Sequence, residues 1–297
     1  MDSPGRRSKI LPSPYHRTRV TAARHPGARP PRPLVYGHRG CALAPENTIA
    51  SFDLALQGGA DGLEMDVRLS RDGVPFVHHD ADLDRCTDGG GPLEALTAAE
   101  LERLDAGYRF ARGGDCGFRA RGVRIPRLAE VLRRYTQAPL IVEVKTYRED
   151  AARAVVDTVR AAGAGGRVCL AAFDHATVAA VRRIAPEIAT SASRDEVSRA
   201  IRFAWFRLPP WRPRYRAVQV PEIAEGRRVV DPAVVRCLHR AGVALQVWTV
   251  NAEDDMRRLL AWGVDGLITD HPGTAVQVRE QVCGAHLMAP VPPVRLE

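Results

Sequence analysis

The sequence contains no run of about 18 apolar residues, which argues against a membrane-spanning helix. Its first 33 residues also lack the apolar core of a secretion signal. The cysteines show no C-x-x-C spacing, so the sequence indicates neither a zinc site nor a disulfide framework. These six residues are Cys41, Cys86, Cys116, Cys169, Cys237 and Cys283. We therefore expect reduced thiols and a cytoplasmic location.

Lysine is scarce too, because only Lys9 and Lys145 stand against 41 arginines. The 297 residues carry a formal net charge of +8, which by itself suggests a nucleic-acid or anionic-membrane partner. The charge is unevenly placed, however: residues 1–33 carry +7 and the other 264 residues carry +1. A uniformly basic domain is excluded, and we expect no specific nucleic-acid partner. Residues 1–33, rich in proline and arginine, are predicted to be a disordered tail before one domain at 34–297.

Beyond the tail, short apolar runs alternate with longer amphipathic segments. The predicted strands are residues 34–37, 62–67, 74–78, 140–144, 168–172, 188–191, 217–220, 244–248 and 266–269. The predicted helices are residues 47–57, 128–135, 148–162, 176–184, 195–205, 232–241 and 253–262. This alternation favours a parallel sheet, and eight repeats close a (β/α)8 TIM barrel. One of the nine strands must therefore lie outside the barrel.

The dipeptide Asp72-Gly73 identifies the extra strand, because Asp-Gly between two alternating segments is a strong hairpin signal. A two-residue loop pairs Arg71 with Val74 and therefore places Asp66 opposite His79. Side chains alternate between the two faces of a strand, so this register puts Glu64, Asp66 and His79 on one face. We expect the second arm to form a hairpin flap on the second barrel strand.

Charged side chains stand at the ends of several predicted strands, where barrel enzymes carry their working groups. They are His38, Arg39, Glu64, Asp66, His79, Glu143 and Lys145. Three clustered carboxylates repel one another unless a cation lies between them, and hard cations such as Mg²⁺ and Ca²⁺ prefer oxygen ligands. The sequence therefore predicts a divalent-cation site formed by Glu64, Asp66 and Glu143.

The order and spacing of these residues resemble the glycerophosphodiester phosphodiesterase family over residues 34–297. The resemblance rests on His38-Arg39-Gly40, Pro45-Glu46-Asn47-Thr48, Glu64-x-Asp66-Val67, Asp72-Gly73, His79-Asp80, Glu143-x-Lys145, Trp248-Thr249-Val250-Asn251, Gly263-Val264-Asp265-Gly266 and Thr269-Asp270-x-Pro272. It implies a metal-dependent hydrolase that cleaves small-molecule glycerophosphodiesters, such as glycerophosphocholine, into glycerol 3-phosphate and an alcohol. It also implies that Mg²⁺ or Ca²⁺ binds the three acids, that the substrate's neighbouring hydroxyl is the first nucleophile, and that residues 81–124 form a variable insertion over the C-terminal face.

The chemistry of phosphodiester cleavage suits the same residues. The reaction must neutralise phosphoryl charge, activate a nucleophile and protonate the departing oxygen. Arg39 offers a planar fork for phosphate oxygens, and Lys145 supplies a compact positive charge. His38 and His79 fit the acid and the base in either order, since imidazole titrates near neutral pH. Trp248 fits a wall of the substrate pocket or the packing of the barrel.

Glu46 and Asn47, which follow the end of the first predicted strand, are predicted to have structural roles. Glu46 and Asn47 open a predicted helix, so we expect Asn47 to cap that helix, and Glu46 is placed to hold Arg39.

Two other functions remain open alternatives. A lysophospholipase D-like enzyme would use the same site on acyl-bearing substrates. A membrane- or nucleic-acid-binding protein would act through the basic tail. Residues 199–216 carry six arginines interleaved with aromatic residues, a mixture found at membrane interfaces, although a solvated surface helix followed by a proline-rich loop is the preferred interpretation. Peripheral membrane contact through 1–33 or 199–216 is thus one predicted partnership.

Overall fold

The structure is a computed structural model that describes residues 32–111, 117–210 and 212–287. The predicted tail lies outside the described residues except for Arg32 and Pro33. The guanidinium of Arg32 donates hydrogen bonds to Asp61 Oδ1 (2.8 Å) and Glu280 Oε1 (3.2 Å), so contacts with the domain begin before residue 34. The five described cysteines are free thiols, as predicted, and Cys116 lies outside the described residues.

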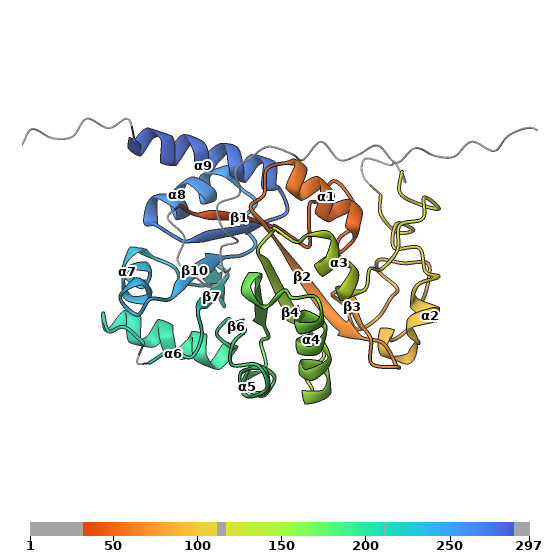
Figure 1. The fold of residues 1–297 in the computed structure, drawn as a ribbon. Coiled ribbons are helices and arrows are strands. Elements are labelled where there is room, and N and C mark those ends of the chain that lie inside the picture. The colour runs from red at the N-terminus through yellow and green to blue at the C-terminus, as the bar shows by residue number, and fades with distance from the viewer. Residues whose placement is uncertain (1–31, 112–116, 211, 288–297) are drawn as a thin grey trace, which may run out of the picture.

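Eight parallel strands form the centre of the molecule (Figure 1). They are β1 (Leu34–His38), β2 (Gly62–Leu69), β4 (Leu140–Val144), β5 (Val168–Ala171), β6 (Ala189–Thr190), β7 (Ala217–Val220), β10 (Ala244–Val247) and β11 (Gly266–Thr269). Their order in the sheet is β6-β5-β4-β2-β1-β11-β10-β7. A parallel bridge between Ser191 and Ala217 joins the two ends of that order. The predicted TIM barrel is therefore confirmed.

Alternation along the strands divides the core into two layers. Tyr36, Ile141 and Ile268 cluster inside the barrel, together with Trp248. Val35, one residue before Tyr36, instead packs with the side chains of the surrounding helices. The strands are consequently apolar on both faces, as parallel strands covered by helices must be.

The helices cover the outside of the barrel (Figure 1). The longer ones are α1 (Ile49–Gln57), α3 (Leu128–Arg134), α4 (Glu149–Ala161), α5 (His175–Ile184), α6 (Arg194–Trp205), α7 (Pro232–Arg240), α8 (Glu253–Trp262) and α9 (Pro272–Leu287). Their ends follow capping chemistry: Asp231 accepts hydrogen bonds from the amides of Ala233 (2.7 Å) and Val234 (2.8 Å), and Pro232 occupies the first turn. None of the helices in the described part of the chain has both the length and the hydropathy that crossing a bilayer requires.

The helix α9 and a strand pair that precedes α7 lie outside the predicted strands and helices. Helix α9 turns Ala275, Val278 and the arginine Arg279 toward the barrel, and a buried arginine obscures the apolar period that signals a helix. Arg279 pairs there with Asp61. A small exposed hairpin of β8 (Ile223–Ala224) and β9 (Arg227–Arg228) precedes α7; strands this short have no alternation to detect.

The predicted register of the Asp-Gly hairpin is wrong by one residue. Strand β3 (Pro75–Val77) pairs antiparallel with β2, and the pairing of Val67 with Val77 places Asp66 opposite His78. The loop has three residues, 71–73, because Ser70 Oγ accepts the Val74 amide hydrogen (2.9 Å) and the Ser70 carbonyl accepts that of Gly73 (2.9 Å). Three-residue hairpins with a left-handed glycine are common, and Gly73 has φ +80°.

The described residues of 81–124, which are 81–111 and 117–124, are largely irregular, as predicted, with a 3-10 turn η1 (Leu93–Ala95) and the short helix α2 (Ala98–Leu101). The segment has a small core of its own, in which Leu83, Leu93 and Leu101 pack against Phe76 of β3. It is therefore attached to the flap strand rather than to the barrel interior.

Candidate active site

All eight predicted site residues line one pocket at the carboxyl ends of the barrel strands. Its lining includes His38, Arg39, Glu64, Asp66, His79, Glu143, Lys145 and Trp248, beside several apolar residues and the polar residues Ser191 and Gln219. His38 ends β1, Glu64 and Asp66 lie on β2, and Glu143 lies on β4. His79 reaches the pocket although the register was wrong, because it lies beyond Val77, the last residue of β3, where the pairing has ended. His78, by contrast, is buried beside the carbonyl of Asp82.

A tight turn after β1 presents Arg39 to the site. The Gly40 amide donates to the Gly37 carbonyl (3.2 Å), and Arg39 itself has φ +49°. This left-handed backbone directs the Arg39 amide hydrogen to Glu64 Oε2 (3.0 Å). Ser51 of α1 fastens the turn, since its hydroxyl accepts from the Cys41 amide (2.7 Å) and lies 3.0 Å from the Arg39 carbonyl.

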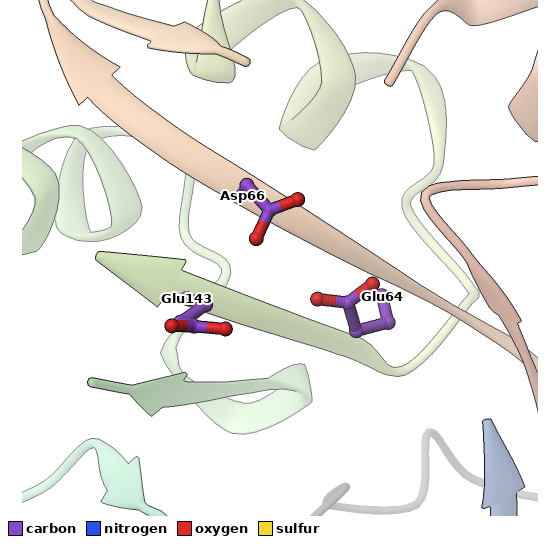
Figure 2. Close-up of side chains that lie close together, drawn as sticks. All are labelled: Glu64, Asp66 and Glu143. Atoms are coloured by element: carbon purple, nitrogen blue, oxygen red, sulfur yellow. The ribbon is translucent and has the colours of Figure 1, made fainter. Parts of the chain in front are cut away.

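Three carboxylates meet in the pocket. Glu64 and Asp66 share one face of β2, and the parallel register places Asp66 beside Glu143 of β4. Their side chains point toward one another (Figure 2), and one oxygen atom from each carboxylate lies within 4.8 Å of the oxygen atoms of the other two. Glu64 and Asp66 are buried. Among the described residues this is the cluster whose donor atoms suit a metal ion.

Burial makes the charge of this cluster costly. Burial and the neighbouring Asp66 raise the pKa of Glu64 to about 8, and burial also raises the pKa of Glu143. Lys145 Nζ lies 2.8 Å from Glu143 Oε1 and 3.2 Å from Asp66 Oδ1, so one cation already offsets part of the repulsion. A hard divalent cation fits the all-oxygen donor set and would favour the ionised form of Glu64.

His38 is oriented by a chain of polar groups from the last barrel strand. Its Nδ1 lies 2.8 Å from Asp270 Oδ1, and Asn251 donates to Asp270 Oδ2 (2.7 Å). Burial lowers the pKa of His38, but the hydrogen bond to Asp270 and the charge of Glu64 outweigh it, so the pKa is raised. This histidine therefore holds its proton more firmly than a free imidazole.

His79, like His38, contacts an aspartate through Nδ1, but its pKa is shifted in the opposite direction. Its Nδ1 lies 2.6 Å from Asp80 Oδ1. Burial lowers the pKa of His79, and Asp66 and Asp80 recover only part of that change, while the positive charges of Arg39 and Lys145 lower it further. The two histidines of one pocket are thus pushed apart in pKa, a separation typical of an acid and a base.

Arg39 is held between two acids. Its Nη1 donates to Glu46 Oε1 (3.0 Å), and its Nε lies 3.1 Å from Asp66 Oδ2. Glu46 therefore holds Arg39, as its position suggested. The expected cap is wrong: Thr48, not Asn47, accepts the Ser51 amide hydrogen at the start of α1 (3.3 Å). Asn47 instead donates to Asp66 Oδ2 (3.0 Å), at φ +56°.

Sequence reasoning assigned no role to Asp80, Asn251 or Asp270, although all three belong to the quoted motifs. Each contacts a site residue or its partner through a side-chain hydrogen bond. The signal was their place within four residues of a strand end, combined with the general need of a catalytic imidazole for an acceptor at its second nitrogen. Their pairing with one histidine or the other depends on tertiary structure.

The remaining wall of the pocket is largely apolar, although Ser191 and Gln219 also line it. Trp248 lies edge-on to Phe173, with ring centroids 6.1 Å apart and planes at 86°. Ile141, Ala171 and Ile268 complete this wall. Of the two interpretations of Trp248, the structure supports both, since the ring lines the pocket and packs in the barrel cluster.

Comparison with known proteins places this arrangement in a family. The model of the glycerophosphoryl diester phosphodiesterase family matches residues 38–274. The chain belongs to that family. A glycerophosphodiester phosphodiesterase of Caldanaerobacter subterraneus is 32% identical over 256 residues, which cover 82% of this chain and 97% of the relative. One of Bacillus altitudinis is 31% identical over 257 residues, covering 84% and 98%.

Solved structures agree with this family assignment. A glycerophosphoryl diester phosphodiesterase domain from Mycobacterium tuberculosis has a TM-score of 0.74 and 26% identity, covering 84% of this chain and 99% of that one. A phosphodiesterase of Oleispira antarctica, solved with the product sn-glycerol-3-phosphate, has a TM-score of 0.67 and 26% identity, covering 83% and 96%.

Two regions with a predicted role in substrate choice or membrane contact contribute no described residue to the pocket lining. Among the described residues, none between 81 and 124 is part of the pocket lining. Residues 199–205 form the second half of α6, and the described residues between α6 and β7 lie where the strands begin, at the end of the barrel opposite the pocket. Trp205, Phe206 and Leu208 are exposed there. Membrane contact through this stretch stays a prediction, as does an influence of 81–124 on substrate choice.

Proposed function

We propose that this chain hydrolyses glycerophosphodiesters to glycerol 3-phosphate and an alcohol, with a divalent cation held by Glu64, Asp66 and Glu143. The observation that carries the proposal is a buried carboxylate cluster in one pocket with two histidines whose pKa values are shifted in opposite directions. The family assignment and the product-bound relative from Oleispira antarctica support the same substrate class. When bound, the cation stabilises the negative charge of the phosphoryl oxygens.

We assign the base to His79 and the acid to His38. His79, with the lowered pKa, accepts the proton of the attacking hydroxyl through Nε2, since Asp80 engages its Nδ1. His38, with the raised pKa, donates its proton to the departing alkoxide. Arg39 and Lys145 bind the phosphate oxygens.

The attacking group in the first step is the substrate's own neighbouring glycerol hydroxyl, which forms a cyclic phosphate that water then opens. Cys41 is the cysteine nearest in sequence to His38 and Arg39, but it is buried and is not part of the pocket lining, so it is not placed to act as a nucleophile. In the second step water gives its proton to His38 and His79 returns its proton to the glycerol oxygen, which restores both histidines. Rapid quench of the reaction should trap the cyclic phosphate, and its complete absence would contradict this route.

The decisive experiment is hydrolysis of glycerophosphocholine with and without EDTA, followed by separate add-back of Mg²⁺ and Ca²⁺. We expect chelation to abolish turnover and one or both cations to restore it. The His38→Ala variant should lose at least about 100-fold in kcat/KM, the size of a general-acid contribution. Turnover that survives thorough chelation, or that persists in His38→Ala, would overturn the proposal.

The apolar wall of the pocket favours a second candidate substrate. Phe173 is 42% exposed at the pocket, where an acyl-bearing diester could place part of its chain. Lysophosphatidylcholine therefore belongs beside glycerophosphocholine in the substrate panel. A lysophospholipase D-like enzyme should prefer the lysolipid to glycerophosphocholine. In the Phe173→Ser variant this preference should fall while turnover of glycerophosphocholine is kept.

A further inference from the structure

Arg85, in the irregular segment after His79, makes three hydrogen bonds to two acids. Its Nη1 and Nη2 donate to the two carboxylate oxygens of Glu46, each at 2.7 Å. Its Nε donates to Asp80 Oδ2 (2.5 Å). One guanidinium group thus uses its whole planar fork on Glu46 and Asp80.

Each of the two acids also contacts a residue to which the proposed function assigns a role. Asp80 engages His79 Nδ1 through its other oxygen (2.6 Å). Glu46 accepts a hydrogen bond from Arg39 Nη1 (3.0 Å). A continuous chain of contacts therefore runs from Arg39 through Glu46, Arg85 and Asp80 to His79.

We propose that Arg85 is a positioning residue that orients His79 and Arg39 together through Asp80 and Glu46. The inference rests on the proposed function, because it assigns Arg85 an effect on the groups used there. Arg85 is absent from the pocket lining and touches no substrate-binding atom.

The charges of the chain alternate in a way that keeps both acids ionised. Burial favours the protonated form of Glu46, but Arg85 and Arg39 outweigh it, so its pKa lies below the ordinary value. Asp80 lies between Arg85 and His79, which hold its pKa low although burial opposes them. An ionised Asp80 accepts the Nδ1 hydrogen of His79 and thereby leaves Nε2 free to accept a proton.

Lysine cannot replace Arg85 in this geometry. A guanidinium presents several N–H groups in one plane, whereas an ammonium group is a single point charge. The distances show Arg85 bridging two separate carboxylates at once. The Arg85→Lys variant should therefore keep the charge and still lose the alignment.

The segment that carries Arg85 is held independently of it. Leu83 and Leu93 are fully buried in its small core, and the Gly91 amide donates to Asp84 (2.8 Å). Arg85 is half exposed, and ion pairs of exposed arginines contribute little to stability. Loss of the guanidinium should consequently affect turnover far more than folding.

Arg124 offers a matched control. It fastens the same segment by donating to the carbonyls of Arg103 (2.9 Å) and Leu104 (3.2 Å), and neither of these residues contacts the pocket. If Arg85 only tied down the segment, Arg85→Gln and Arg124→Gln would behave alike.

The test compares Arg85→Gln, Arg85→Lys, Arg85→Ala and Arg124→Gln with the wild-type chain on glycerophosphocholine. We expect kcat/KM to fall roughly 10- to 100-fold in all three Arg85 variants, with an unchanged melting temperature, and to stay near the wild-type value in Arg124→Gln. Free guanidinium ion, well below denaturing concentrations, should restore part of the turnover of Arg85→Ala. Turnover near wild type in Arg85→Gln, or an equal loss in Arg124→Gln, would overturn the proposal.

A second readout separates this inference from the proposed function. Nitrogen-15 NMR of His79 reports whether Nδ1 stays hydrogen-bonded, with or without catalysis. We expect that signal to change in Arg85→Gln and to keep its position in Arg124→Gln. If the wild-type chain fails to cleave the diester, the proposed function is wrong. The role of Arg85 is then tested by the His79 signal alone, and a signal that is unchanged in Arg85→Gln would refute that role.

Discussion

At the scale of single residues, the two histidines differ chiefly in what surrounds them. Both bond an aspartate through Nδ1, at 2.8 Å for His38 and 2.6 Å for His79. Burial lowers the pKa of His79, and the positive charges of Arg39 and Lys145 lower it further against the opposing effect of Asp66. Burial also lowers the pKa of His38, but there the hydrogen bond to Asp270 and the carboxylate of Glu64 outweigh it and raise the pKa. The assignment of acid and base therefore follows from the neighbours rather than from the imidazoles.

The pH profile of Asp270→Asn tests that assignment. The Asp270 carboxylate stabilises the protonated form of His38, so its removal lowers the pKa of His38. If His38 is the acid, it must be protonated to act, and the alkaline limb of kcat/KM should move to lower pH. The acidic limb, set by His79, should stay in place. An acidic limb that moves instead would exchange the two roles.

The site can also be tested at Lys145, the single lysine beyond the tail. Its ammonium group lies between Asp66 and Glu143, so Lys145→Met removes a charge that offsets the carboxylates and binds phosphate. We expect a higher KM for glycerophosphocholine and a kcat/KM lower by roughly 10- to 100-fold. Lys145→Arg should recover little, because the bulkier fork does not fit between the two acids. Steady-state kinetics of both variants provide the check.

At the scale of elements, strand positions were predictable and loop geometry was not. Each barrel strand is recognisable in the sequence as a short apolar run, because helices cover one face of the strand and the barrel interior covers the other. The hairpin register depended on Ser70, whose hydroxyl bonds the Val74 amide and so lengthens the loop by one residue. The residue type of Asn47 favours a helix cap, but in the folded chain its side chain donates a hydrogen bond to Asp66 instead. Such choices depend on partners distant in sequence.

The turn after β1 is the element on which the site depends most, and Gly40→Ala tests it. Gly40 has φ +100°, and an added methyl carbon would lie 2.7 Å from the backbone carbon of Ser51. Strained backbone and overpacking together should cost roughly 2–5 kcal/mol of unfolding free energy, and the displaced Arg39 should reduce turnover. Urea denaturation and kinetics would measure both.

Gly73→Ala is the control for that variant. Gly73 also has positive φ (+80°), but an added methyl would have no neighbour within 4 Å. Only the backbone strain remains, so we expect a loss of about 1 kcal/mol and nearly normal turnover. Equal losses in the two variants would show that the contact with Ser51 is unimportant.

At the scale of the whole molecule, the net charge of +8 says little about the domain. Residues 1–33 carry +7, and the rest of the chain carries +1. Within that nearly neutral domain, three acids lie close together in the pocket, and two of them, Glu64 and Asp66, are buried. The electrostatic cost of this cluster therefore belongs to the stability of the whole fold.

That cost predicts how stability depends on pH. The ordinary pKa of Glu64 is 4.5, and in the folded chain it is about 8. Between these values the folded state binds more protons than the unfolded state, so this group makes the metal-free protein less stable as pH rises. A divalent cation binds the ionised form and should reverse that loss.

We therefore expect cation binding to raise the melting temperature, and to raise it more at pH 8 than at pH 6. At a free concentration 100 times the dissociation constant, binding adds about 2.7 kcal/mol to stability, which is several degrees for a chain of this size. Differential scanning fluorimetry with EDTA, Mg²⁺ or Ca²⁺ at both pH values measures the effect. Glu64→Gln removes a ligand and the titrating group together, so its melting temperature should respond little to cation and less to pH. A wild-type response equal at both pH values would show that protons and the cation do not compete for Glu64.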